Sequence, residues 1–146
     1  MTYPSSILKR VTIRGYNTQE ASTKMAELSS KFKAISPGMD LENATDGLVS
    51  TMQAFHIKVE DAEREIMDSI NRVGNTMATS NDEIVEMLKR SSAAMYAANN
   101  TLAETIALEA ASVQITRNAQ ITGTAFRTKG LSMCIVICTK NIFNCR

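Results

Sequence analysis

Apolar residues recur at helical spacing through most of this chain, and no proline interrupts residues 40–122. Between Leu41 and Ile66 the apolar positions follow one another at steps of three, four or seven residues, which places them along one side of an α-helix. The stripe shifts by one residue at Ile70, and a similar stripe resumes beyond Ser80. The pattern predicts long helices that pack against other helices.

Residues that start and stop helices divide this pattern into three expected helices. The first runs from about Asn17 to Ile35, because Ser36-Pro37-Gly38 is a strong stop and turn. The second begins after Asp40, whose side chain suits an N-cap. The third runs from about Asn81 to about Thr122, and Gly123 is expected to end it.

The break between the second and third helices is expected within residues 71–81. Gly74-Asn75 can end a helix through a left-handed residue, and Ser80 with Glu83 forms a capping box for the next one. One continuous rod through Gly74 is the alternative. We favour the break because a helix breaker and a helix cap occur together.

The sequence therefore predicts an all-α fold of three helices with a dominant long, coiled-coil-like antiparallel hairpin and irregular N- and C-terminal tails. Residues 1–16 are expected to be irregular or extended, since Arg10 to Arg14 alternate polar and apolar as a short strand does. Residues 17–123 form the helical hairpin or bundle domain, and residues 124–146 form an apolar, cysteine-containing tail.

Eight apolar residues form the predicted seam, and we expect them to pack either inside the chain or against a partner helix. If the Phe55 ring is buried, its replacement by alanine should cost about 3 kcal/mol or more. The seam residues are Met52, Phe55, Val59, Ile66, Leu88, Met95, Leu102 and Ile106.

Charge is unevenly distributed although the formal net charge is only +1. The first 35 residues and the residues after 90 are net basic, whereas residues 40–90 are net acidic. We favour a solvated acidic helix as the explanation. The alternative is that basic ends meet the acidic middle, within one chain or between copies.

The residue types needed for catalysis or for a metal site do not come together in this sequence. His56 is the only histidine, and the three cysteines Cys134, Cys138 and Cys145 all lie near the C-terminus. The acidic run of residues 60–68 lies mostly off the apolar stripe, as a solvated helix face does. We therefore expect no enzyme activity, no cofactor and no metal.

Partners other than protein are also not expected. Basic residues are dispersed with no aromatic platform among them, which argues against nucleic acid. The apolar run from Leu131 to Cys138 is too short to span a bilayer, and no secretory signal precedes residue 15. A cytoplasmic location is favoured, with secretion by a route that needs no signal peptide as the alternative.

Three non-enzymatic functions remain open. The first is a helical assembly or adaptor protein that associates, as an oligomer, with itself or with a partner helix along the seam. The second rests on a resemblance to the small helical-hairpin proteins of bacterial type VII secretion, with Arg72-Val73-Gly74 where that family has Trp-x-Gly. The third rests on Leu102-Ala103-Glu104-Thr105 before an apolar tail, which resembles a SNARE-type membrane-fusion coiled coil.

Overall fold

The computed structural model describes residues 5–13 and 19–140, with the backbone alone described at positions 10, 13 and 131–140. All regular elements within these residues are helical. In chain order they are α1 (Ser5–Ile13), α2 (Gln19–Ile35), α3 (Leu41–Phe55), the π-helical turn η1 (Glu63–Met67), α4 (Asp68–Thr76), α5 (Asn81–Ala97), α6 (Leu102–Thr116) and α7 (Ala119–Lys140).

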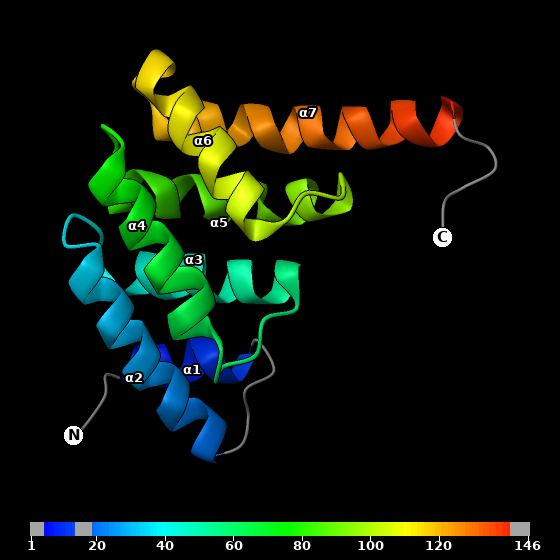
Figure 1. Cartoon of the computed structure of the whole chain (residues 1–146). Coiled ribbons are helices and arrows are strands. Elements are labelled where there is room, and N and C mark those ends of the chain that lie inside the picture. The colour runs from blue at the N-terminus through cyan, green and yellow to red at the C-terminus, as the bar shows by residue number, and fades with distance from the viewer. Residues whose placement is uncertain (1–4, 14–18, 141–146) are drawn as a thin grey trace.

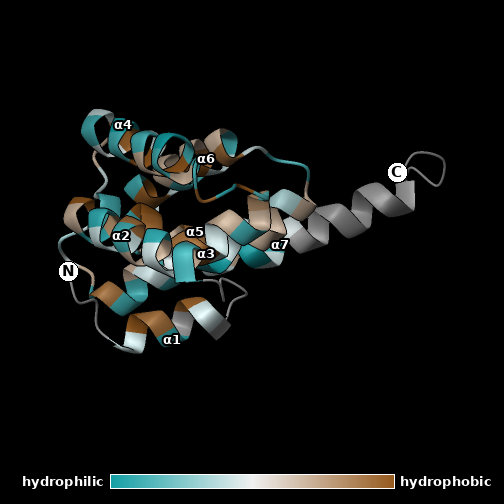
Figure 2. Cartoon of the chain, turned by 90° about the horizontal axis from the view of Figure 1, so that it is seen from below, coloured by the Kyte–Doolittle hydropathy of each residue, from teal (hydrophilic) through white to brown (hydrophobic). Residues whose placement is uncertain are grey.

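The helices are arranged in two crossing layers. Figure 1 shows α3, α5 and α7 side by side in one layer, while α2, α4 and α6 run across them in the other. The same two layers are visible from below in Figure 2, where α1 lies at the edge beside α2. Because α5 contacts α3, α4, α6 and α7, it is the central helix of the fold.

The same arrangement of caps and buried positions occurs twice along the chain. Asp40 caps α3 and Ser80 caps α5 at equivalent places. Forty residues apart along the sequence, four pairs of buried residues occupy matching positions, the first member in α3, η1 or α4 and the second in α5 or α6. These pairs are Ala44 with Ile84, Leu48 with Leu88, Ile66 with Ile106, and Ile70 with Ala110. The second unit therefore stacks beside the first, as repeated helix pairs do.

Two helices begin at side-chain caps that the sequence predicted. Asp40 accepts a hydrogen bond from the Asn43 amide at 2.6 Å. Ser80 and Glu83 form the predicted capping box, in which the Ser80 amide donates to Glu83 Oε2 at 2.9 Å. These contacts satisfy amides that a helix leaves without an intrahelical partner.

The prediction of three helices is wrong, although the all-α class is confirmed. The expected second helix is divided at His56, which takes a left-handed conformation with φ 56° and ends α3. The expected third helix is divided twice, near Asn99 with φ 64° and at Arg117 with φ 54°. The long antiparallel hairpin is therefore replaced by shorter helices that fold back on one another.

Both ends of the chain also differ from expectation. Residues 5–13 form helix α1 instead of an irregular or extended segment. Gly123 lies inside α7, which continues through the segment that carries Cys134 and Cys138, whereas Cys145 lies outside the described residues. The proposed division into segments 1–16, 17–123 and 124–146 stays a prediction.

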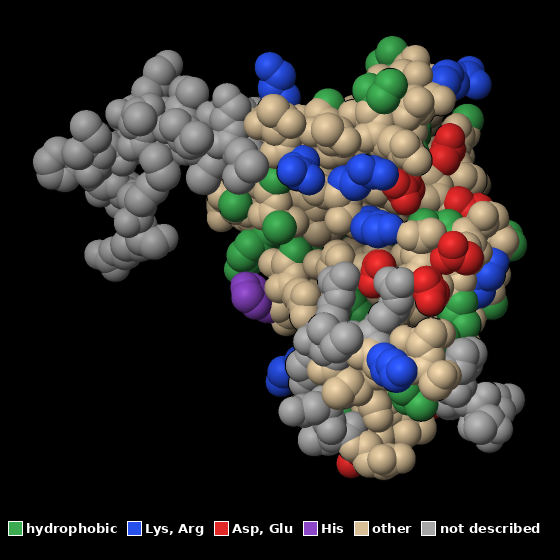
Figure 3. Space-filling view, turned by 180° about the vertical axis from the view of Figure 1, so that it is seen from behind, with side chains coloured by type: hydrophobic (Ala, Val, Ile, Leu, Met, Phe, Trp, Pro, Cys, Tyr) green, Lys and Arg blue, Asp and Glu red, His purple; other side chains and the backbone are tan. Residues whose placement is uncertain are grey.

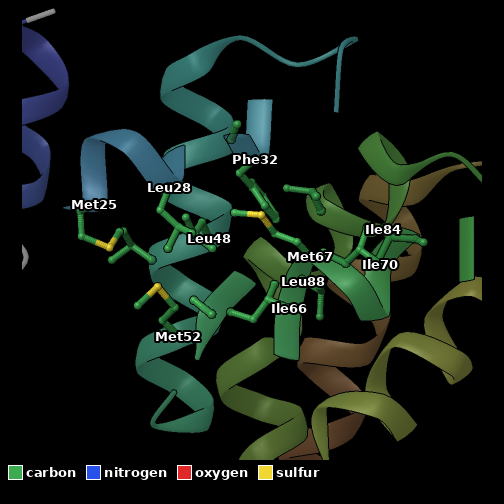
Figure 4. Close-up of a cluster of buried hydrophobic side chains, with 14 of the residues drawn as sticks. Met25, Leu28, Phe32, Leu48, Met52, Ile66, Met67, Ile70, Ile84 and Leu88 are labelled. Atoms are coloured by element: carbon green, nitrogen blue, oxygen red, sulfur yellow. The ribbon is translucent and has the colours of Figure 1, made fainter. Parts of the chain in front are cut away.

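One hydrophobic cluster joins both layers. Figure 4 shows Phe32 and Met67 close together, with Leu48, Ile66 and Leu88 nearby. Ile7 and Val11 of α1 are buried in the same cluster. The burial of apolar side chains from α1 to α6 is therefore the main contribution to the stability of the fold.

Candidate interaction surface

Most of the predicted seam residues lie in the protein's own core, and they do not form one continuous exposed stripe. Helix packing divides them into fully buried and half-buried residues. Met52, Ile66, Leu88, Met95 and Ile106 are buried, whereas Phe55, Val59 and Leu102 are half-buried. The half-buried residues are the ones that a partner could reach, and partner binding by the seam stays a prediction.

Two of these half-buried residues, Phe55 and Leu102, line an open groove of about 560 Å³. We call it the aromatic groove. Its apolar lining also includes Ile57 and Tyr96, and Glu65, Ala97, Asn99, Asn100 and Thr101 complete it. A lining that combines apolar and polar side chains is typical of many protein-binding surfaces.

Tyr96 is the most exposed of the large apolar side chains in the aromatic groove, with 45% of its surface accessible. Its ring centroid lies 5.7 Å from that of Phe55 and 5.2 Å from that of His56, both in edge-to-face geometry. Figure 3 shows hydrophobic side chains gathered beside this histidine on the surface. The neighbouring rings hold Tyr96 in place, so a partner would meet a pre-positioned aromatic side chain.

Two backbone reversals create the groove. His56, in its left-handed conformation, ends α3, and the Ile57 amide donates to the Met52 carbonyl at 2.9 Å. Asn99, also left-handed, follows α5, and the Asn100 amide donates to the Met95 carbonyl at 3.0 Å. These bonds occupy carbonyls at the ends of the two helices. As a result, Phe55 and Tyr96 meet at adjacent helix ends.

The capping box of α6 forms part of the groove's edge. Glu104 accepts hydrogen bonds from the amide and the hydroxyl of Thr101, each at 2.8 Å. The bond from the Thr101 amide, followed by the one from its hydroxyl, holds the pKa of the Glu104 carboxyl below its usual value. The edge is thus fixed by an ionised carboxylate at neutral pH.

A second exposed apolar area lies where α6 meets α7. Leu108 is 46% exposed, Ile115 is 86% exposed and Ile121 is 63% exposed. Figure 3 shows hydrophobic side chains on this end of the molecule. We call this set of three residues the α6–α7 corner. Unlike the aromatic groove, it contains no predicted seam residue and no aromatic side chain.

The sequence did not single out Tyr96, because it lies next to Met95 and outside the stripe that pointed to the core. The same holds for Ile57, which follows a helix end that the apolar spacing did not reveal. An available signal was the scarcity of aromatic residues, which make up only 5% of the chain. Phe55 and Tyr96 are two of them, and aromatic side chains are enriched at binding surfaces.

Several charged side chains on the described part of the chain form ion pairs. Lys31 lies 3.0 Å from Glu63, and Arg90 lies 2.6 Å from Glu86. On the face in Figure 3, basic and acidic side chains are interspersed. The described residues contain no group of three or more His, Cys, Asp or Glu placed to hold a metal ion. None of their helices is long and apolar enough to cross a membrane.

Comparison with known proteins identifies the family of this chain. The family model described as "Phage-related minor tail protein" matches residues 5–133, which include every helix from α1 to α6 and more than half of α7. Neither the curated proteins nor the solved structures gave a match. Because the family model covers most of the sequence, the chain belongs to the phage-related minor tail protein family.

Proposed function

We propose that this protein is a non-enzymatic helical component of a phage tail or of its assembly, and that it binds another protein chain through the aromatic groove. The observation that carries the proposal is the exposed Tyr96 ring, which packs edge-to-face on Phe55 and His56 beside an open groove. Family membership supports a structural role in a phage tail.

The chemistry of the groove fits protein recognition better than catalysis. Its apolar residues can take side chains from a partner, while Asn99 and Asn100 lie at its edge with amide groups. Aromatic side chains that are held rigidly lose little conformational entropy on binding and often dominate interface energies. A partner helix or loop with one or two protruding apolar side chains is the occupant we propose.

Neither alternative from the sequence gains support. The resemblance to type VII secretion proteins would require two long helices joined at Gly74. Instead, Gly74 lies within the short helix α4 (Asp68–Thr76), and the next helix, α5, ends at Ala97. The resemblance to SNARE proteins needs an unbroken heptad region, which the turn at Asn99 divides. The family match favours the assembly function over both.

A charge placed in the groove tests the proposal. Tyr96→Asp should weaken association by roughly tenfold or more, since a buried, unpaired carboxylate is strongly unfavourable at an interface. The matched control is Ile115→Asp, which introduces the same charge at the more exposed α6–α7 corner. Thr23→Asp, on the exposed side of α2, controls for the charge itself.

The measurement is the mass of the full chain in solution by sedimentation, alone and in native extract from cells that make it. We expect a complex that Tyr96→Asp disrupts and both controls retain, with helix content unchanged by circular dichroism. A strict monomer under both conditions, or a complex indifferent to Tyr96→Asp, would contradict the proposal. A complex lost only with Ile115→Asp would place the interface at the corner and equally reject the groove.

A further inference from the structure

Glu109 is a carboxyl group in the interior of the protein. It lies on α6, on the side that packs against α5, and its exposed fraction is 0%. Other acidic residues, such as Glu63 and Glu86, lie nearer the surface and pair with Lys31 and Arg90. Because an isolated buried carboxylate is very unfavourable, this position needs a specific explanation.

The hydrogen bonds around Glu109 supply that explanation. The Ser91 hydroxyl is within hydrogen-bonding distance of both the Met87 carbonyl, at 2.9 Å, and Glu109 Oε1. A hydroxyl carries one hydrogen, and a carbonyl can only accept. Ser91 donates to both acceptors, so its single hydrogen is shared between them. Oε1 of an ionised Glu109 would therefore receive only part of one hydrogen bond, which favours the neutral acid.

The other carboxyl oxygen leads to the same conclusion. Glu109 Oε2 is buried and makes no hydrogen bond with the described part of the protein. An ionised carboxylate would spread its negative charge over both oxygens and leave Oε2 charged without a donor. A neutral carboxylic acid leaves only an uncharged carbonyl oxygen there, which costs much less free energy.

No nearby charge compensates Glu109. The helices packed against α6 are α4, α5 and α7, and their charged residues include Asp68, Arg72, Arg90 and Arg127. Within the described residues, none of these groups contributes to the shift of the Glu109 pKa, whose causes are desolvation and the Ser91 hydroxyl. The charge state of Glu109 is thus set by burial and by Ser91.

We propose that Glu109 is a proton-dependent latch between α5 and α6: with its proton it links the two helices through Ser91, and loss of the proton loosens α6. α6 carries Leu102 at the aromatic groove and Leu108 at the α6–α7 corner. The latch would therefore couple pH to the position of a helix that contributes to both exposed apolar areas. It is independent of whether either area binds a partner.

Burial raises the pKa of Glu109 to about 8, and the hydrogen bond from the Ser91 hydroxyl partly opposes this rise. The unfolded chain releases the same proton near the ordinary value of 4.5. Between these two values folding takes up a proton, so stability decreases as the pH rises from about 4.5 to about 8. Within that window, each pH unit changes the folding equilibrium by about tenfold for one such group.

The first test is the titration of the wild-type protein itself. The carboxyl carbon of Glu109, followed by NMR in the full chain, should titrate near pH 8. Hydrogen exchange of the α6 amides, corrected for the intrinsic pH dependence, should accelerate over the same range. A Glu109 titration near 4.5 would overturn the proposal, and so would α6 protection that is constant to about pH 9.

The second test uses Glu109→Gln, which keeps the shape, remains uncharged and retains an oxygen that can accept from Ser91. We expect its urea-unfolding midpoint to lack the decrease between about pH 4.5 and about pH 8 that we expect for the wild type. The matched control is Glu60→Gln, the same chemical change at an exposed position, which should keep that decrease. Retention of the wild-type decrease in Glu109→Gln would overturn the proposal. If this variant does not fold, the titration of the wild type decides alone.

Discussion

Gly123 of α7 lies against the backbone of Met87 in α5, so closely that a side-chain carbon at Gly123 would come within 3.0 Å of the Met87 α-carbon. One heptad further on, a side-chain carbon at Gly130 would lie 3.1 Å from the Ala94 carbonyl oxygen. The two contacts advance in the same direction along both helices, so α7 runs parallel to α5. Glycine is needed here for close approach of the helices, with ordinary helical backbone at both positions.

Gly123→Ala should therefore destabilise the protein even though alanine favours helix formation. Overpacking against backbone costs about 1–3 kcal/mol, and the higher helix propensity of alanine returns up to about 1 kcal/mol. We expect a net loss of about 1 kcal/mol, measured by urea unfolding. Thr124→Ala, at the exposed neighbouring position, is the control and should be neutral or slightly stabilising. Equal stability of Gly123→Ala and wild type would show that α5 and α7 can move apart enough to accommodate the methyl group without a net loss of stability.

Ser80→Ala tests the capping box at the start of α5. The change removes the acceptor for the Glu83 amide and leaves that donor without its partner. We expect a loss of about 1 kcal/mol, within the range of about 0.5–2 kcal/mol typical of cap removal. Ser112→Ala in the middle of α6 removes only a hydroxyl that donates to the Leu108 carbonyl, so it should be neutral or stabilising. Comparable losses in the two variants would argue against a specific cap.

Phe55→Ala should cost less than the sequence-based expectation for a buried ring. The Phe55 side chain is half-buried and packs edge-to-face on Tyr96, so we expect a loss of about 1–2 kcal/mol. Met52→Ala, three residues earlier and 1% exposed, should cost more, about 2–5 kcal/mol, because it leaves a cavity in the core. Thermal unfolding of both variants gives the order directly. A larger loss for Phe55 than for Met52 would contradict the burial of these two residues.

The class of the fold and several helix starts could be predicted because they depend on local chemistry. Asp40 and Ser80 accept hydrogen bonds from amides three residues ahead, and that contact needs no other part of the chain. The stop at Ser36-Pro37-Gly38 is also local, and α2 ends at Ile35. Such signals identify helix boundaries wherever side chains contact their own backbone.

The interior breaks could not be predicted because no glycine or proline lies at or beside them. His56, Asn99 and Arg117 each take a positive φ, which is unfavourable for most residues outside glycine. At each of these positions the chain changes direction, and the short helices on both sides pack into the shared core. The apolar spacing continues across these turns because successive helices present their stripes to one shared core, so several helices give the same pattern as one long helix.

The candidate site was predictable only in part. Phe55 and Leu102 belonged to the predicted seam, and both line the aromatic groove. Tyr96 joins them only because α3 and α5 end side by side, a relationship that depends on the turn at His56. Glu109 could not be distinguished from a solvated helix residue, since its burial depends on the contact of α6 with α5. Spacing along one helix does not contain that information.

Acid should weaken two helix starts, in a pH range separate from that of Glu109. The amide and hydroxyl of Thr101 lower the pKa of Glu104 below 4.5, and the Asn43 amide lowers that of Asp40 below 3.8. A carboxyl whose pKa is lower in the folded state stabilises the protein above its unfolded value and loses that contribution as the pH falls through the folded value.

We expect wild type and Glu104→Gln to differ in stability at neutral pH and to converge below about pH 4. Urea unfolding over that range provides the measurement, and Glu60→Gln is the control because it leaves both caps intact. A difference between wild type and Glu104→Gln that stays constant down to about pH 3 would mean that the ionised carboxylate does not stabilise the start of α6.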